Sequence, residues 1–257
     1  MKKTILLSSI LAAGAAFAAV TPTPIEVNST EVGVIKLAKP TKATLIAVPF
    51  LGYEGGDIKV ADMINTAELE AGTKLYVPNV SNDGTLTYEV WTLSSEKKWG
   101  TPKTIIDINN LGEAKDATGA AANESSVARG GSYWLEPAAR PAAGSEENIY
   151  LLGRPTSQDG TSTAVGGKWN LVGNASAAAV VLGAATKLDQ IAIQQSDGNF
   201  RYYTYQGTLG WSYQNDDDGK WNIRQDPSVA LGYGLWFKPA NTSTIDWAKG
   251  TITPVTK

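Results

Sequence analysis

Short stretches of alternating apolar and polar residues follow one another through most of the chain beyond its first thirty residues. The runs "TKLYVP", "LTYEVWTL", "LDQIAIQ" and "FRYYTYQ" are rich in β-branched and aromatic residues, which favour strands. Asp83-Gly84 lies between the first two runs and Asp197-Gly198 lies between the last two. Because Asp-Gly suits the type I′ turn of a tight hairpin, the pattern predicts an all-β fold containing two β-hairpins.

A helical period occurs in one stretch, "VADMINTAELEAGT". Its apolar residues Val60, Met63, Ile64 and Ala67 recur at the spacing of one helix face, and Gly72 supplies a stop. We therefore expect one short helix here. The matching stretch nearer the C-terminus, "SAAAVVLGAATKL", reads as either a second, degraded helix or an irregular loop.

The two predicted hairpins resemble each other in the order of their landmarks. The matched pairs, aligned on the turn glycines, are Gly84 with Gly198, Tyr88 with Tyr202, Trp91 with Tyr205 and Trp99 with Trp211. Farther along, "GGSYWLEP" parallels "GYGLWFKP". A shared order of landmarks indicates an internal duplication, here into two tandem domains of the β-sandwich or β-barrel-like kind.

The landmarks and the composition of the connecting stretches predict how the chain divides into domains. The run "IYLLGR" is expected to form the first strand of copy two. The expected parts are a signal peptide (1–18), a Pro/Thr-rich leader (19–30), β-domain copy one (31–140), a linker (141–148), β-domain copy two (149–250) and a tail (251–257).

The N-terminus has the features of an export signal. Lys2 and Lys3 precede a short apolar run that ends in the small-x-small pattern at residues 16–18. We expect cleavage after Ala18 and residence in the periplasm, at the cell surface or outside a bacterium. No second long apolar run follows, so we expect no transmembrane segment after cleavage.

Charge and composition narrow the range of activities. Removing the two lysines of the signal peptide from a chain of net charge −3 leaves −5, which disfavours nucleic acid as a partner. The chain has no histidine and no cysteine, which excludes histidine acid–base chemistry, cysteine nucleophiles and the usual zinc sites. We expect a protein that is not an enzyme. A glycoside hydrolase with two carboxylates stays as the weakest alternative, because no acidic residues form a motif.

A resemblance to a known kind of module covers about two thirds of the exported chain. The run "KWNLVGNA", then "DQIAIQQSDGNFRYYTYQGTLGW" and "GYGLWFKP", resembles a module of exported bacterial surface proteins: Trp-Asn-Leu-x-Gly-Asn-Pro, an aromatic strand, then Gly-x-Gly-x-Trp/Phe-Trp/Phe. The resemblance is strongest over 168–239 and weaker over 44–137. Ala175 departs from it, since proline is usual there. It implies an all-β, exported, non-catalytic module and assigns no functional residues.

Aromatic side chains on the hairpin strands are the first candidate site. Alternation places Tyr202 with Phe200 on one face, and Tyr203 with Tyr205 on the other beside Arg201. The first face is more uniformly apolar in both hairpins, so we assign it to the core. The second face then offers rings that could stack on the C–H faces of sugars, or it is buried in a second layer. The ligand-binding candidates are Tyr203, Tyr205, Trp91, Trp99 and Trp211.

An acidic loop, "YQNDDDGKW", is the second candidate. Its carboxylates Asp216, Asp217 and Asp218 suit Ca²⁺, which takes six to eight oxygen ligands. The alternative is a solvated hairpin tip, because Asp-Asp-Gly is also favourable turn chemistry. We expect no other cofactor.

Three function classes remain after these exclusions. The leading one is a secreted structural or surface-interaction protein with a protein or glycan partner at the cell surface, or one that assembles with itself. The second is a carbohydrate-binding, lectin-like protein that uses exposed Tyr and Trp. The third is the carboxylate-based glycoside hydrolase.

Overall fold

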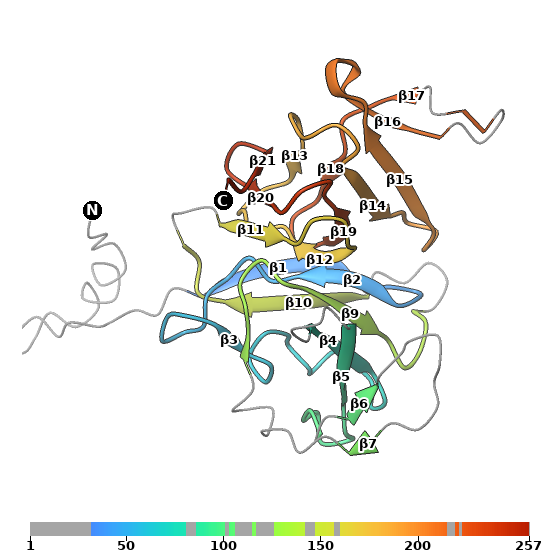
Figure 1. Ribbon diagram of the computed structural model, residues 1–257. Coiled ribbons are helices and arrows are strands. Elements are labelled where there is room, and N and C mark those ends of the chain that lie inside the picture. Colours follow the sequence, from blue (N-terminus) through green and yellow to red (C-terminus); the bar gives the residue numbers. More distant parts are fainter. Residues whose placement is uncertain are drawn as a thin grey trace, which may run out of the picture. The chain divides into compact units, whose positions relative to one another are not determined.

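The fold is all-β (Figure 1). The computed structural model describes residues 32–80, 86–100, 103–105, 115–116, 126–141, 147–156, 160–214, 219–220 and 223–256. Within these ranges the helical content is one 3₁₀ turn, Gly207–Leu209, and no helix is long and apolar enough to span a membrane.

Strands β1 to β10 make up what we call the first half of the fold, coloured blue to yellow-green in Figure 1. Six of them form an antiparallel sheet, the first sheet, in the order β2-β9-β4-β5-β6-β7, while β1 pairs with β10 and β3 pairs with β8. In chain order the strands are Gly33–Ala38, Thr44–Ala47, Ile58–Lys59, Lys74–Val80, Leu86–Thr92, Lys103–Ile105, Lys115–Asp116, Ser126–Val127, Ser132–Glu136 and Asn148–Gly153.

Strands β11 to β21 make up the second half, coloured yellow to red. The second sheet has the order β12-β19-β14-β15-β16-β17, which repeats the first sheet strand for strand, and β13 pairs with β18 as β3 pairs with β8. Strands β11, β20 and β21 form a small third sheet. The strands are Thr161–Ala164, Asn170–Gly173, Val180–Val181, Gln190–Gln194, Phe200–Tyr205, Trp211–Tyr213, Ile223–Arg224, Ser228–Val229, Gly234–Lys238, Ser243–Asp246 and Thr251–Pro254.

The likeness of the two sheets extends to single hydrogen bonds. The amide of Leu93 donates to the carbonyl of Thr73 at 2.8 Å, and the amide of Tyr205 donates to the carbonyl of Asp189 at 2.9 Å, in the same place of each sheet. The duplication stays a prediction, and the shared strand order together with these shared bonds supports it.

Strand register gives a better match between the two sheets than the turn glycines do. Both predicted hairpins are present, β4 with β5 and β14 with β15. Leu75 pairs with Trp91 in the first, and Ile191 pairs with Tyr203 in the second. Trp91 therefore matches Tyr203, and its match with Tyr205 is wrong by two residues. The cause is that twelve residues separate the paired positions in the second hairpin and sixteen in the first.

The turn of the second hairpin is not the type I′ turn that we expected. The amide of Gly198 donates to the carbonyl of Gln195 at 2.9 Å, and Gly198 has φ of 85° while Asp197 is not among the residues with positive φ. A type I′ turn needs positive φ at both central residues, whereas a type I turn followed by a left-handed glycine needs it at the glycine alone. The Asp83-Gly84 turn lies outside the described residues.

The two halves meet through a reciprocal backbone contact. The amide of Ala47 at the end of β2 donates to the carbonyl of Gly232 at 2.9 Å. The amide of Gly173, which holds the equivalent place at the end of β12, donates to the carbonyl of Gly130 at 2.7 Å. The side chain of Arg129 adds a link, because it donates to the carbonyls of Pro49 in the first half and Ala175 in the second. The two halves therefore contact each other through equivalent segments, the end of β2 in the first half and the end of β12 in the second.

Two hydrophobic clusters, the first core and the second core, lie within the two halves. Strand β10, expected to begin copy two, pairs with β1 instead, and its Ile149 and Leu151 are buried in the first core. Strand β21, in the expected tail, pairs with β20 and buries Ile252 in the second core. Each core is thus completed by strands that follow its six-stranded sheet in the chain.

The helix expected over "VADMINTAELEAGT" is wrong. Val60, Met63 and Ile64 are buried in the first core, but Ala67 on the proposed helix face is exposed. The backbone pairs with β10, since the carbonyl of Met63 accepts a bond from the amide of Leu152 at 2.9 Å. A short helix is costly to nucleate, and hydrogen bonds to a neighbouring strand replace its internal ones. The stretch "SAAAVVLGAATKL" forms β13 and an irregular loop.

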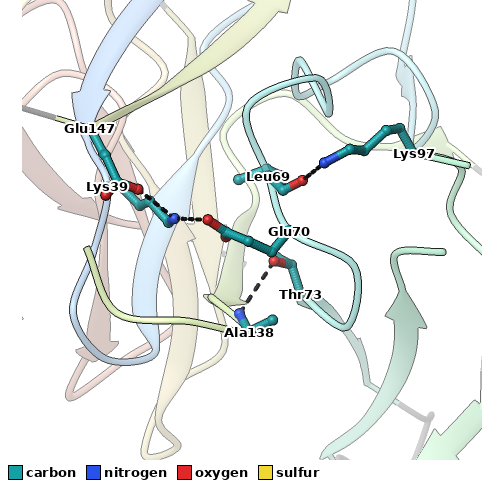
Figure 2. A network of polar contacts seen from close by, with 7 residues as sticks. All are labelled: Lys39, Leu69, Glu70, Thr73, Lys97, Ala138 and Glu147. Carbon is teal, nitrogen blue, oxygen red and sulfur yellow. Dashed lines mark hydrogen bonds and ion pairs between the residues drawn. The ribbon is translucent and has the colours of Figure 1, made fainter. Parts of the chain in front are cut away.

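A buried lysine ties three segments of the first half together (Figure 2). Lys39 follows β1, and its side chain is 1% exposed. Its ammonium donates to the carboxylate of Glu147 at 2.7 Å and to that of Glu70 in the loop before β4. A buried charge needs such partners, because leaving it unpaired is strongly unfavourable.

Candidate functional site

The aromatic residues expected to form an exposed strip are mostly core residues. Trp91 and Trp99 lie in the first core, and Tyr203 and Trp211 lie in the second, with Tyr203 only 5% exposed. Tyr205 is partly buried against the second core, with its ring 5.3 Å from that of Trp211. Of the two alternatives for these rings, burial is correct for the four core residues, Tyr205 is partly buried, and the exposed strip is wrong.

The error lies in the choice of face and not in the alternation. Tyr202 is 52% exposed, although its face was assigned to the core, and its neighbour Tyr203 points into the second core. In the first sheet, both Tyr88 and Trp91 are buried, although they lie on opposite faces of β5. The face with more apolar residues is therefore not always the buried one. In the first sheet, side chains on both faces of β5 are buried.

The acidic candidates Asp216, Asp217 and Asp218 lie outside the described residues. Within the part of the chain that the structure describes, no group of three or more His, Cys, Asp or Glu side chains is placed to hold a metal ion. The calcium site stays a prediction.

An aromatic hollow opens on the second sheet, on the side turned away from the second core, which we call the outer face. Its volume is about 260 Å³. The residues that line the hollow are Trp169, Ala192, Phe200, Tyr202 and Trp236. Tyr202 and Trp169 are the most open of these, at 52% and 39% exposure, while Ala192 at 2% forms the floor. Large exposed rings gathered around a small residue are unusual on protein surfaces, and patches of this kind are typical of binding sites.

Strand register accounts for the shape of the hollow. Ala192 on β14 pairs with Tyr202 on β15 and with Trp236 on β19, so the alanine has a large ring on each side. Residues directly opposite on antiparallel strands share a face, and their side chains lie close together. The alanine methyl leaves between those rings the space that a larger side chain would fill.

Trp169 lies in the turn before β12 and lines the hollow. The side chain of Asn170 stabilises that turn. The side-chain amide of Asn170 donates to the carbonyls of Val165 and Lys168, at 3.0 and 2.7 Å, and its oxygen accepts from the amide of Val165 at 3.0 Å. The ring of Trp169 then meets that of Tyr202 edge to face, with centroids 6.2 Å apart and planes at 72°. This is a favourable geometry for an aromatic pair, so the two walls of the hollow hold each other in place.

A second, polar hollow of about 290 Å³ adjoins the first and shares Phe200 and Tyr202 with it. Its remaining lining residues are Gln195, Asp197, Asn199, Arg201, Tyr213 and Gln214. The guanidinium of Arg201 lies 4.6 Å from the centre of the Tyr213 ring, and hydrogen bonds from the amide and side chain of Asn199 lower the pKa of Asp197. An apolar and a polar compartment thus share one wall.

In the first sheet, a tyrosine stands at the position equivalent to Ala192. Tyr76 pairs with Trp134 and Val90, as Ala192 pairs with Trp236 and Tyr202. The Tyr76 hydroxyl donates to the carboxylate of Glu136. Burial, together with this carboxylate, raises the pKa of Tyr76. The second sheet therefore has alanine where the first has Tyr76, and beside it the ring of Tyr202 where the first has Val90.

A further cavity, of about 490 Å³, lies where the second hairpin meets the first half. Gln194 closes one side of it: its oxygen accepts from the amide of Leu45 at 3.0 Å, and its nitrogen donates to the carbonyl of Ala43 at 2.8 Å. Lys42 donates to the carbonyl of Asp197 at 2.8 Å. These bonds fasten the hairpin that carries Phe200 and Tyr202 to the first half.

Comparisons of the chain with protein-family models, with curated proteins and with solved structures give no match.

Proposed function

We propose that the chain is an exported bacterial protein that is not an enzyme and that binds a surface partner through the aromatic hollow of its second sheet. The single observation that carries the proposal is the exposed ring cluster built around Ala192, at a position where the first sheet has a packed tyrosine. Exposed apolar area is costly to keep in water, so a gathered patch of it points to a ligand or partner.

The predicted signal peptide supports the exported setting of this proposal, and the absence of cysteine is compatible with it. The proposal keeps the internal duplication and moves the end of copy one beyond β10, since β10 completes the first core. One copy then serves as a packed support, and the other carries the binding face.

A hydrolase is the less favoured alternative for chemical reasons. Hydrolysis of a glycosidic bond uses two carboxyl groups about 5 to 10 Å apart on either side of the bond. The aromatic hollow is lined by rings and a methyl group, and the polar hollow contributes the single carboxylate of Asp197. These linings suit binding better than bond cleavage.

The test is binding of the purified, fluorescently labelled chain to isolated bacterial cell envelopes, with and without substitutions in the hollow. We expect Tyr202→Ala to weaken binding strongly. The matched control is Leu209→Ala, since Leu209 is also 52% exposed but lies in the 3₁₀ turn, away from the hollow. Equal binding by the wild type and the Tyr202→Ala chain, or no envelope binding at all, would refute the proposed function.

A further inference from the structure

We propose that the aromatic hollow and the polar hollow together bind two consecutive sugar units of a neutral glycan. This inference rests on the proposed function and names the chemical class of its ligand. The apolar compartment would take the C–H face of one pyranose ring, and the polar compartment would take the hydroxyls of the next.

The first argument is the pairing of the two compartments. Phe200 and Tyr202 line both, so the two hollows lie next to each other and one extended ligand can contact both. A sugar chain has this same division, with apolar C–H faces and a rim of hydroxyl groups. Small-molecule sites in general combine apolar walls with a few polar groups that set orientation. The shared wall predicts a ligand that is amphipathic along its length.

The second argument is size. The hollows measure about 260 and 290 Å³, each at or below the lower end of about 300–1,000 Å³ for sites that hold drug-sized ligands. Each therefore suits a unit of roughly one six-membered ring. Two similar volumes side by side match a repeating polymer better than one compact ligand.

The third argument is the chemistry of the polar compartment. Gln195, Asn199 and Gln214 carry amide groups, which both donate and accept hydrogen bonds, as sugar hydroxyls do. Asp197, with its lowered pKa, bears a negative charge at neutral pH and lies in the same lining as Arg201. One charge of each sign favours a neutral ligand over a polyanion.

The fourth argument is that the walls are held in place before any ligand arrives. Phe200 meets Trp134 of the first half edge to face, with ring centroids 6.0 Å apart. Tyr202 meets Trp169 in the same way, and Gln194 fastens the hairpin through two hydrogen bonds. Rings that are already ordered lose little side-chain entropy on binding, which raises affinity.

A proline-rich peptide is the competing occupant, because such peptides dock in aromatic-lined grooves. A peptide of that kind would contact the rings of the aromatic hollow, but it would not need the amide side chains of the polar hollow. The adjoining polar hollow therefore favours the glycan, and the peptide becomes an outcome of the test.

The test is affinity electrophoresis of the folded chain in gels that contain one neutral polysaccharide each: laminarin, xyloglucan, galactomannan or pectic galactan. We expect retardation by at least one of them. Tyr202→Ala should weaken it about tenfold or more, because one of the rings that would stack on the sugar is lost. Ala192→Tyr should abolish it by filling the hollow, as Tyr76 fills the first sheet.

Two controls keep the result interpretable. Leu209→Ala should migrate as the wild type does, and near-ultraviolet circular dichroism should confirm that every variant is folded. Asn199→Ala should weaken retardation by the glycan, and the synthetic peptide "AVTPTPIEVNST", which serves as the proline-rich probe, should not bind the wild type.

Three results would overturn the inference. One is retardation that persists in both Tyr202→Ala and Ala192→Tyr, because the ligand would then bind elsewhere. Another is binding of the proline-rich peptide in the hollow with no glycan retarded. The last is no retardation by any glycan while envelope binding still depends on Tyr202, which would leave the proposed function standing and exclude this ligand class.

Discussion

At equivalent positions on the outer faces of the two sheets, Tyr76 fills a space that Ala192 leaves open. The two sheets share their strand order and the pairing of their central strands. They also share the backbone hydrogen bonds at the ends of the hairpin strands. The two faces therefore differ in a small residue at the centre, Ala192 for Tyr76, and in a large ring beside it, Tyr202 for Val90. The comparison teaches that two sheets of one architecture can be a support and a binding surface, and that the change lies in side-chain volume.

The largest expected effect concerns the place where the two halves meet. A Cβ at Gly234 would overlap the Ser132 hydroxyl and lie 2.7 Å from the Ser132 Cβ, and Ser132 holds the equivalent place in the first sheet. We predict that Gly234→Ala destabilises the fold by about 1–3 kcal/mol, because overpacking forces the backbone apart. Urea unfolding followed by tryptophan fluorescence measures it.

A rescue experiment sharpens this prediction. Adding Ser132→Gly to Gly234→Ala removes the overlap, so the double variant should regain most of the lost free energy of unfolding. Additive losses from the two substitutions would contradict the close contact between the halves.

The next effect concerns a buried carboxylate in the second half, at a position where the first half has a hydroxyl group. Asp189 is 0% exposed and accepts bonds from the amides of Ala240 and Thr186, at 2.8 and 3.0 Å. At the equivalent place the hydroxyl of Thr73 accepts from the amide of Ala138 at 3.3 Å. Asp189→Asn can satisfy one of the two amides and should cost about 1–3 kcal/mol at neutral pH, because a buried donor loses its acceptor.

The stability of the fold should depend on pH through Asp189. Burial raises the pKa of Asp189 above its ordinary 3.8, although the hydrogen bonds from Ala240 and Thr186 oppose the rise. The folded state therefore binds the proton more tightly than the unfolded state, and this carboxyl makes stability fall as pH rises from about 3.8 through the raised pKa. Asp189→Asn should remove that slope. An unchanged slope in urea unfolding across this window would show that Asp189 is not its source.

The smallest effect concerns backbone strain. Leu188 has φ of 77° and is 63% exposed, and the equivalent residue of the first half is Gly72, with φ of 90°. A left-handed conformation costs a residue with a side chain about 1–2 kcal/mol. We predict that Leu188→Gly raises the free energy of unfolding by up to about 1 kcal/mol, since the entropy that glycine gains when unfolded offsets part of the relief. Gly72→Leu should lower stability, and a stabilising result there would contradict the comparison.

Much of the fold follows from the sequence. The alternating runs predict the strands of both hairpins, and the parallel landmarks predict a duplication, which the shared strand order of the two sheets supports. The helix over 60–73 was wrong because tertiary bonds to β10 outweigh the short apolar period. The turn-glycine alignment was wrong because hairpin length differs between the sheets, and a glycine marks only the turn.

The site was harder to predict than the fold. Alternation separates Tyr202 from Tyr203 correctly, but it does not say which of two apolar faces is covered. The available signal was Ala192, a small residue at a position where the first hairpin has Tyr76. The sequence aligns the first strands of the two hairpins correctly, but it places the second strands two residues out of register, so it did not show which rings flank the alanine. Trp169 was missed because it lies in a turn and not in an alternating run.

The most direct test of the central claim is ¹⁹F NMR of the chain labelled with 5-fluorotryptophan, titrated with the polysaccharide that retards it most. Single Trp→Phe variants assign the eight resonances. The account predicts that the Trp169 and Trp236 resonances shift with saturation while those of the buried Trp91 and Trp211 stay in place. Shifts confined to tryptophans outside the hollow, with Trp169 and Trp236 unmoved at saturation, would contradict the claim that the outer face of the second sheet is the binding surface.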